Sequence, residues 1–588
     1  MHPTTKRRAA ASRTYALGVA DLNLCAALGV ALEAVAAARA ILLAECAQSD
    51  GPRGEIGHCL ADDEAEWAIR ERLLAAFPDW GYLGEETGTG PRATGADCVW
   101  IVDPNDGTRA MQRGYRGHAV SVGLVRRGVP VLGAVCAVNA PDDRGDLVAW
   151  AEGCGPILRN GLPLEPVTWP HRLETEDVVC LSLGANRNPV GNLAAVAPAR
   201  FVGMPSIAYR LALVAVGECA AAVSLQHLSA WDFAAGHALV RAAGGVVVDE
   251  NGHDIVYAAD GQSRCLRIFG GGKEVVDELV PRAWHRAAGG GFGEAAPPPS
   301  LAPVRPQPGQ LIHDAGVLNR AHGCVLGQVA GGALGAVPQG IMAGQPTGDS
   351  ELALLLARHL IASDGFDQDA VAQAYAGWSH GWTHATAAHS LGRVSPLGIW
   401  GASRAPEEVA GAARQDAQLT HPHPVCQDAS ALFAVTVAAA IRQGLDPRQT
   451  YDFAVAWSRT EDIAPGVRRA LLAAVHGPPA DFLGQQGWVL VALQNAFFEL
   501  LDAQDVEEAV VRTVRRGGDT DTNAAICGAL MGAVYGRDSI PEQWQRMVLS
   551  CRPMPGHPGV NQPRPAQYWA VDALLLAERL LGRGDQTY

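Results

Sequence analysis

The chain contains 588 residues, of which 48% are hydrophobic and 18% are charged, and its formal net charge at pH 7 is −15. This length exceeds what one hydrophobic core supports, since domains average about 150 residues, and it predicts two or more large domains. The acidic balance excludes an extended nucleic-acid-binding surface, because phosphate backbones bind basic patches and the sequence contains no long one.

Cysteine usage and the N-terminal composition bear on the cellular compartment. Thirteen cysteines are scattered without Cys-x-x-Cys pairs, which argues against a disulfide framework or a structural zinc site. Residues 1–13 are basic and predict a disordered tail, because no apolar run with a cleavage site follows them directly. Polar residues interrupt the Ala- and Leu-rich stretch 15–47, so we expect two packed helices there rather than a membrane span. The chain is therefore predicted to be cytoplasmic, without a membrane partner.

Residues 62–77 predict an amphipathic helix that ends before Pro78. Ala65, Ile69 and Leu73 recur at helical spacing on one face. Asp62 lies at the start of this helix, where a carboxylate could cap the helix or face a metal site.

The sequence Trp-Ile-Val-Asp-Pro-Asn-Asp-Gly-Thr at residues 100–108 carries the strongest chemical signal of this half. Its apolar beginning predicts the end of a buried strand, which Pro104 cannot continue. Asp103 and Asp106 therefore leave the sheet together, and two carboxylates that face one small space repel each other unless a cation lies between them. Hard oxygen ligands of this kind suit Mg2+ or Mn2+. Taken alone, the stretch could equally be a polar turn between a strand and a helix.

The residues that follow these carboxylates suit an anion. Gly107 and Thr108 begin a predicted helix, where free backbone N–H groups and a hydroxyl can receive a phosphate. Arg109 comes next, and its planar guanidinium could contact a second phosphate or lie solvated on a helix face.

Strands and helices alternate in the rest of this half. Residues 120–138 predict two strands joined by a turn at Arg-Arg-Gly, and residues 150–163 predict another hairpin. Residues 206–216 and 233–243 show helical patterns.

Three separated motifs occur in an order that resembles the inositol monophosphatase family, and the resemblance covers roughly residues 15–285. The motifs are Gly84-Glu85-Glu86, Asp103-Pro104-Asn105-Asp106-Gly107-Thr108 and Trp231-Asp232-Phe233-Ala234-Ala235. The resemblance implies an α/β layered sandwich and a phosphomonoesterase that depends on Mg2+ or Mn2+ and acts on a small-molecule phosphate ester. The metal ligands that it implies are Glu85, Asp103, Asp106, Asp232, the backbone carbonyl of Asn105, and Asp62 near a weaker third position.

The same resemblance assigns roles around the reacting phosphate. Glu85 and Thr108 match the pair that positions and activates the attacking water. The resemblance also implies a catalytic role for Asp106. Gly107 and Thr108 would bind the phosphate. Arg109, followed by the stretch 129–133, is reminiscent of members that act on phosphorylated nucleotides. The resemblance also favours a homodimer through this domain.

A Gly- and Pro-rich segment separates the two halves. Its composition cannot offset the entropy cost of folding, so it predicts a linker. We expect a phosphatase domain at 14–286, the linker at 287–318 and a second domain at 319–588.

From residue 322 onward the pattern is helical, and it surrounds a second acidic motif. The run Arg-Gly-Gly-Asp-Thr-Asp-Thr-Asn at 516–523 places Asp519, Asp521 and Thr522 around a turn, an arrangement suited to Mg2+ or Mn2+. This motif resembles the ADP-ribosylglycohydrolase family, with the resemblance spanning about 320–580. It implies an all-α domain that acts on ADP-ribose or an ADP-ribosylated substrate. Asp349 would join the metal ligands.

Three departures from this second family put the activity of the C-terminal domain in doubt. Gly332, Gln339 and Gly348 stand where acidic residues are expected. With fewer carboxylates, the site would bind a second divalent ion more weakly. The leading hypothesis is therefore a bifunctional hydrolase, and the alternatives are an active phosphatase with an ADP-ribose-binding module or with a regulatory domain that gates it.

Overall fold

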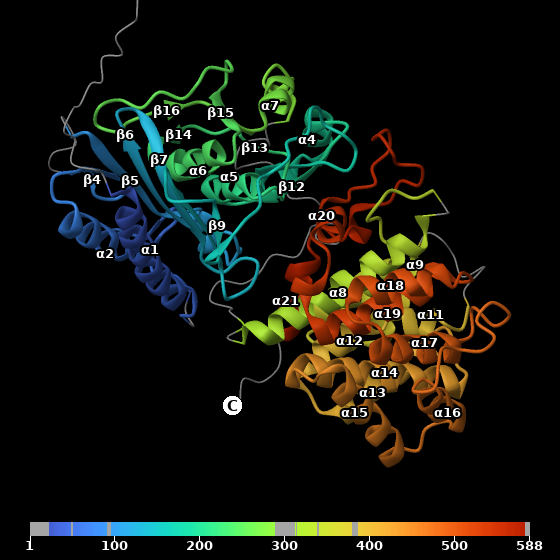
Figure 1. Ribbon diagram of the computed structural model, residues 1–588. Coiled ribbons are helices and arrows are strands. Elements are labelled where there is room, and N and C mark those ends of the chain that lie inside the picture. The colour runs from blue at the N-terminus through green and yellow to red at the C-terminus, as the bar shows by residue number, and fades with distance from the viewer. Residues whose placement is uncertain are drawn as a thin grey trace, which may run out of the picture.

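Two structural units follow one another along the chain, a mixed α/β unit and a helical unit (Figure 1). The computed structural model describes residues 23–48, 51–90, 96–287, 312, 314–337, 340–378 and 386–582.

The first unit is built on an eight-stranded sheet with strand order β10-β9-β8-β7-β6-β5-β3-β4. Its strands are β3 (Gly81–Gly84), β4 (Gly88–Thr89), β5 (Cys98–Asp106), β6 (Ala119–Arg126), β7 (Val129–Ala137), β8 (Asp146–Ala151), β9 (Leu158–Arg159) and β10 (Leu162–Pro163). Strand β5 is buried over its whole length because helices cover both faces of the sheet at this point. This burial explains its continuous apolar beginning.

A second sheet of five strands has the order β12-β11-β13-β17-β15. Its strands are β11 (Val178–Ser182), β12 (Arg200–Met204), β13 (Ala221–Ser224), β15 (Val246–Asp249) and β17 (Ile268–Gly271). Two shorter pairs, β1 (Gly54–Glu55) with β2 (His58–Cys59) and β14 (Leu228–Ser229) with β16 (Arg264–Cys265), lie outside both sheets.

Helices fill the space between and around the sheets. α1 (Leu24–Cys46) and α2 (Leu60–Ala76) share an apolar core with the outer face of the large sheet. α5 (Ile207–Ala215) and α6 (Ala230–Ala242) lie in the core between the two sheets, and α4 (Pro189–Val196) and α7 (Lys273–Leu279) cover the far face of the small sheet. The layered α/β sandwich predicted from the sequence is confirmed. The remaining elements of this half are α3 (Thr108–Met111), η1 (Leu183–Arg187) and η2 (Trp284–Arg286).

The prediction for residues 15–47 was wrong in one respect. Two helices were expected, but α1 runs unbroken from Leu24 to Cys46: Glu33 is exposed to solvent, and Arg39 donates to the carbonyls of Val138 and Asp143, so neither residue interrupts the helix. Residues 15–22 lie outside the described residues. α1 and α14 (Pro424–Gln443) are the two described helices long and apolar enough to span a membrane. α14 is largely buried in the helical unit, and α1 packs on α2 and the large sheet.

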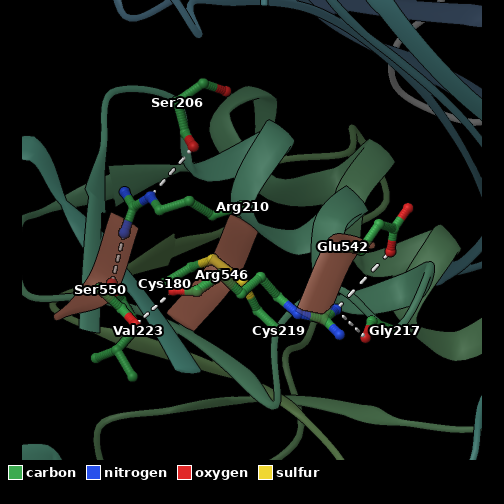
Figure 2. The surroundings of a disulfide bond; sticks show 9 residues. All are labelled: Cys180, Ser206, Arg210, Gly217, Cys219, Val223, Glu542, Arg546 and Ser550. Carbon is green, nitrogen blue, oxygen red and sulfur yellow. Dashed lines mark hydrogen bonds and ion pairs between the residues drawn. A yellow bond between two sulfur atoms is a disulfide. The ribbon is translucent and has the colours of Figure 1, made fainter. Parts of the chain in front are cut away.

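Two disulfides were not expected from the cysteine pattern. Cys25 pairs with Cys154 and Cys180 with Cys219, and the other nine cysteines are free and buried. Each disulfide joins residues distant in sequence, so the spacing of cysteines along the chain does not reveal the pair. Figure 2 shows the second disulfide close to Arg546 of α20 (Glu542–Ser550), a helix of the other unit.

The second unit is helical, with no strand among its described residues. Its all-α prediction is confirmed. Besides α14 and α20, its elements are α8 (Ala315–Gly335), α9 (Gly348–Ala362), α10 (Gln368–Ala376), α11 (His389–Gly392), α12 (Ser395–Trp400), η4 (Gly401–Ser403), α13 (Pro406–Gln418), α15 (Pro447–Thr460), α16 (Pro465–Ala473), α17 (Val489–Asp502), α18 (Val506–Arg515), α19 (Thr520–Tyr535), η5 (Arg537–Ser539), η6 (Ala566–Tyr568) and α21 (Ala573–Leu581).

Helices α8 and α19 meet at a seam of small residues. A Cβ added at Gly327 would lie 2.1 Å from the carbonyl oxygen of Gly528, and one added at Gly323 would lie 2.3 Å from that of Gly532. The two backbones therefore touch directly, which only glycine permits at these positions. This seam places the N-terminus of α19 beside the C-terminal end of α8.

Arginines connect the two units. Arg116, before β6, forms a buried ion pair with Glu578 of α21, with side chains 9% and 6% exposed. Arg200 of β12 donates to the carbonyls of Ala343 and Met547, and Arg552 donates to the carbonyl of Phe201. These contacts between the units are polar and largely buried, and α20 faces β12 in Figure 1.

Candidate active site and metal centres

An acidic cluster forms where three elements of the first domain end or begin. β3 and β5 run parallel, so Glu85 after β3 emerges at the same edge as Asp103 and Asp106 at the end of β5. Asp232 lies in the first turn of α6. Ligand oxygens of Asp103, Asp106 and Asp232 all lie within 4.8 Å of one another. Three of the predicted metal ligands therefore converge.

Close packing brings α6 to this position. A Cβ added at Gly133 of β7 would lie 2.2 Å from the carbonyl oxygen of Ala235, and one at Gly123 of β6 would lie 2.9 Å from the amide of the same residue. The Ala-rich helix thus lies directly on the glycines of the sheet, and Asp232 is held over the end of β5.

The carboxylates of the cluster destabilise one another. Burial, followed by repulsion from Glu85, Asp106 and Asp232, raises the pKa of Asp103 well above its usual range. Burial and the charge of Asp106 also raise the pKa of Asp232. Desolvation raises the pKa of Glu85 to about 7. A divalent cation would relieve this repulsion, and a donor set made of carboxylate oxygens fits Mg2+ or Mn2+.

One oxygen of Asp106 is anchored by helix α5. Asp106 Oδ2 accepts hydrogen bonds from the Ser206 hydroxyl at 2.6 Å and from the Ala208 amide at 2.8 Å. Arg210 lies buried in the same helix and donates to the carbonyls of Ser206 and Val223, as Figure 2 shows. Ser206 was predicted only as part of a helix. Its contact with Asp106 spans 100 residues, and no local pattern reports it.

Glu66 fixes the loop that carries Glu85. Its carboxylate accepts from the amides of Glu86 at 2.7 Å and Thr87 at 3.0 Å. A Cβ at Gly84 would lie 1.9 Å from Glu66 Oε1, so glycine is required where this carboxylate passes under the loop. Sequence reasoning missed Glu66, although it lies one helical turn after Asp62.

Asp62 lies inside the site. Asp62 Oδ2 accepts from the Thr108 hydroxyl at 2.9 Å, and Oδ1 accepts from the Asn105 side chain at 2.8 Å. Burial raises the Asp62 pKa to about 6. The carboxylate also caps its own helix through the Cys59 amide at 3.4 Å, as expected for one of its two possible roles. Gly107 adopts φ 109° immediately before α3, which turns Thr108 toward Asp62.

Arg109 is exposed and lies over the turn between β1 and β2. A Cβ at Gly57 would lie 2.9 Å from its Nε, which places the guanidinium against this turn at the rim of the site.

The second acidic motif lies at the N-termini of α9 and α19. Asp349 is 1% exposed, and neither of its carboxylate oxygens accepts a hydrogen bond within the described residues. Burial raises the pKa of Asp349, and burial together with neighbouring carboxylates raises the pKa values of Asp519 and Asp521. Thr522 follows them, buried, in the same turn. An unpartnered buried carboxylate facing two others suits a cation.

The departures predicted for this domain have a structural basis. A Cβ at Gly332 would lie 2.8 Å from the Thr347 hydroxyl and 3.2 Å from that of Ser350, so these hydroxyls fill the space where an acidic side chain would extend. A Cβ at Gly348 would lie 3.2 Å from the Trp378 ring. Gln339 lies outside the described residues.

His389 is a further residue of this site that the sequence did not single out. Its Nδ1 accepts from the Thr386 amide at 3.0 Å, and the Thr386 hydroxyl donates to Asp519 at 3.1 Å. A histidine at the start of the short helix α11 offers no motif by which to recognise it.

Comparison with known proteins finds relatives of both halves. The model of the inositol monophosphatase family matches residues 26–271, and that of the ADP-ribosylglycohydrolase family matches residues 313–583. The Nus factor SuhB of Xylella fastidiosa is 32% identical over 221 residues, which are 36% of this chain and 75% of that protein. An inositol-1-monophosphatase of Rhizobium meliloti is 35% identical over 205 residues, 33% of this chain and 71% of that protein. A histidinol-phosphatase of Chlorobaculum parvum is 32% identical over 206 residues, 34% of this chain and 75% of that protein.

Proposed function

The chain belongs to the inositol monophosphatase family over its first half and carries an ADP-ribosylglycohydrolase domain in its second, and from this premise we propose a two-domain hydrolase. The first domain hydrolyses a small-molecule phosphate monoester and uses Mg2+ or Mn2+. The observation that carries this proposal is the convergence of Asp103, Asp106 and Asp232 with mutually raised pKa values.

The residues around the cluster divide the work of hydrolysis. Bound divalent ions would supply charge neutralisation on the phosphoryl oxygens and a more acidic water. Asp103, Asp106, Asp232, Glu85 and the Asn105 carbonyl would hold them. The Thr108 hydroxyl donates to Asp62, so its lone pairs can accept a hydrogen bond from the attacking water, while Glu85 accepts the other proton. The amides of Gly107 and Thr108 bind the phosphate.

The substrate class is a polar alcohol or nucleotide ester. The relatives are named for inositol phosphate and histidinol phosphate hydrolysis, which are esters of small polar alcohols. Arg109 at the rim supplies a planar cation for a second phosphate or another anionic group of the substrate.

The test is phosphate release from a panel of esters with Mg2+, comparing wild type with Asp103→Asn. The panel includes inositol phosphates, histidinol phosphate, 3′-phosphoadenosine 5′-phosphate and phosphorylated ADP-ribose. We expect turnover that Asp103→Asn lowers by at least about 100-fold, because a buried ligand charge is lost. Equal rates for the two proteins would contradict the proposed site.

The second domain binds an ADP-ribosyl group, with Asp349, Asp519, Asp521 and Thr522 holding a metal ion against the ribose hydroxyls. Hydrolysis of the C1″ glycosidic bond is the first candidate activity. The second candidate is binding without cleavage, which the Thr347 and Ser350 hydroxyls in the space beside Gly332 favour. Calorimetric titration with ADP-ribose and an assay of ADP-ribosyl release separate them: binding without release supports the second.

A further inference from the structure

A chain of hydrogen bonds runs from the interior of the first domain to the hydroxyl of Thr108. Cys46 Sγ at the end of α1 lies 3.8 Å from His118 Nε2, and His118 Nδ1 lies 2.7 Å from Asn105 Oδ1. Asn105 Nδ2 lies 2.8 Å from Asp62 Oδ1, and Thr108 Oγ1 lies 2.9 Å from Asp62 Oδ2. Five side chains from α1, α2, α3, β5 and the segment before β6 thus form one network.

The direction of each bond follows from the Asp62 end. An ionised carboxylate only accepts, so the Asn105 group that faces it is the NH2. The Asn105 oxygen therefore faces His118 and needs a donor, which places the imidazole proton on Nδ1. Nε2 is then an acceptor and receives the Cys46 thiol. Every bond has one donor and one acceptor, and the imidazole is neutral.

Burial makes this network rigid. His118 is 0% exposed, and Asn105 and Asp62 are each 1% exposed, so bulk water does not compete for these bonds. A buried network in which each polar atom has a partner holds its members in one arrangement. Asp62 therefore has a fixed position relative to Thr108.

This position decides where the Thr108 proton goes. The hydroxyl has one proton and two acceptors within reach, Asp62 Oδ2 at 2.9 Å and the Asn105 carbonyl at 3.1 Å. A carboxylate held in place is the stronger acceptor. The Asn105 carbonyl then keeps its lone pairs for a cation, and those of the hydroxyl stay available to water.

We infer that Asn105 and His118 are positioning residues of the phosphatase site, which hold the Asp62 carboxylate so that it takes the Thr108 proton and spares the Asn105 carbonyl. The backbone of Asn105 would ligate the metal ion while its side chain orients the group that activates water. This inference rests on the proposed phosphatase function.

Four full-length proteins test it: wild type, Asn105→Leu, His118→Phe and the double variant. Each single change leaves a buried polar partner unpaired, so both should lower Tm. The double variant replaces the pair by apolar groups and should regain the part of the Tm that each single variant loses through the unpaired partner at 105 or 118. Its kcat should nevertheless stay about 10- to 100-fold below wild type with KM within about twofold, because Asp62 has lost its donor.

A second readout does not depend on turnover. Mn2+ affinity is measured by titration on all four proteins, each carrying Asp519→Asn to weaken the second centre. The double variant should bind Mn2+ about tenfold more weakly, since the Thr108 proton is now shared with the backbone carbonyl at position 105. His237→Phe serves as the matched control. His237 lies in α6, and its Nδ1 is 3.0 Å from the Tyr257 hydroxyl. Loss of this contact should lower Tm without changing kcat or Mn2+ affinity.

Two results would overturn the inference. A double variant that regains both Tm and kcat would show that the pair serves packing alone. If the wild-type protein hydrolyses no ester, the proposed function fails, but the Mn2+ titration still tests the inference. A stable double variant that binds Mn2+ as tightly as wild type would show that the pair does not position Asp62.

Discussion

Each ionised carboxylate in the acidic cluster lowers the stability of the metal-free protein. Burial and three like charges raise the pKa of Asp103, so its ionised form destabilises the metal-free protein. We predict that Asp103→Asn raises the unfolding free energy of the metal-free protein by about 1–3 kcal/mol while abolishing turnover. Thermal unfolding in EDTA measures the first effect, and phosphate release the second. A lower Tm in EDTA would contradict the prediction.

Asp62 should make stability depend on pH in a known direction. Its pKa is about 6 in the folded state against 3.8 as a free group, so the folded protein binds more protons between these values. Stability therefore falls as pH rises from about 4 to about 6, by about 1–3 kcal/mol from this group. Asp62→Asn should flatten that part of the curve. Tm measured against pH in EDTA checks this, and an unchanged slope in the variant would contradict it.

At the scale of elements, the seam between α8 and α19 sets the geometry of the C-terminal centre. Gly327→Ala would push a methyl group into the Gly528 carbonyl and separate the helices, moving Asp519 and Asp521 away from Asp349. We expect a loss of about 1–3 kcal/mol of stability and weaker metal binding in this domain, with phosphatase activity retained.

Gly411→Ala is the matched control for this substitution. Gly411 lies within α13 with no atom within 4 Å of an added Cβ, so alanine there should stabilise by up to about 1 kcal/mol. Thermal unfolding and metal titration of both variants test whether the seam between α8 and α19 positions the site. Equal responses at the two positions would show that the seam does not constrain the site.

Local sequence patterns predicted most helices and strands of the first domain, but few of the residues that hold its site in place. The strand–turn–helix at 100–108, the hairpin at 120–138 and the helices at 207–215 and 230–242 lie where periodicity placed them. Ser206, Glu66 and His118 were missed because each acts on a residue distant along the chain, as with Ser206 and Asp106. Asn105 was expected to contribute its carbonyl, but its side chain makes four further contacts that no spacing reveals.

At the scale of the whole molecule, the ion pair between Arg116 and Glu578 joins the two domains. Glu578→Ala leaves Arg116 buried with Asp143 as its remaining ion-pair partner, so the loss of stability should be about 1–3 kcal/mol. Asp538→Ala breaks an ion pair across the same interface to Arg144, but both side chains are about half exposed and the loss should stay below about 1 kcal/mol. Chemical denaturation measures both. Equal losses would mean that burial of the first pair contributes nothing.

The arginines that cross the interface differ in whether they bind a backbone carbonyl or a side chain of the other domain. Arg200, Arg546 and Arg552 each donate to backbone carbonyls, which every amino acid supplies. Substitutions at the contacted positions therefore leave these bonds available, and each half can diverge in sequence without a matching change in the other. Correlated substitution between the halves should concentrate where recognition depends on two side chains, as at Arg116 and Glu578, and at the more exposed pair Arg144 and Asp538.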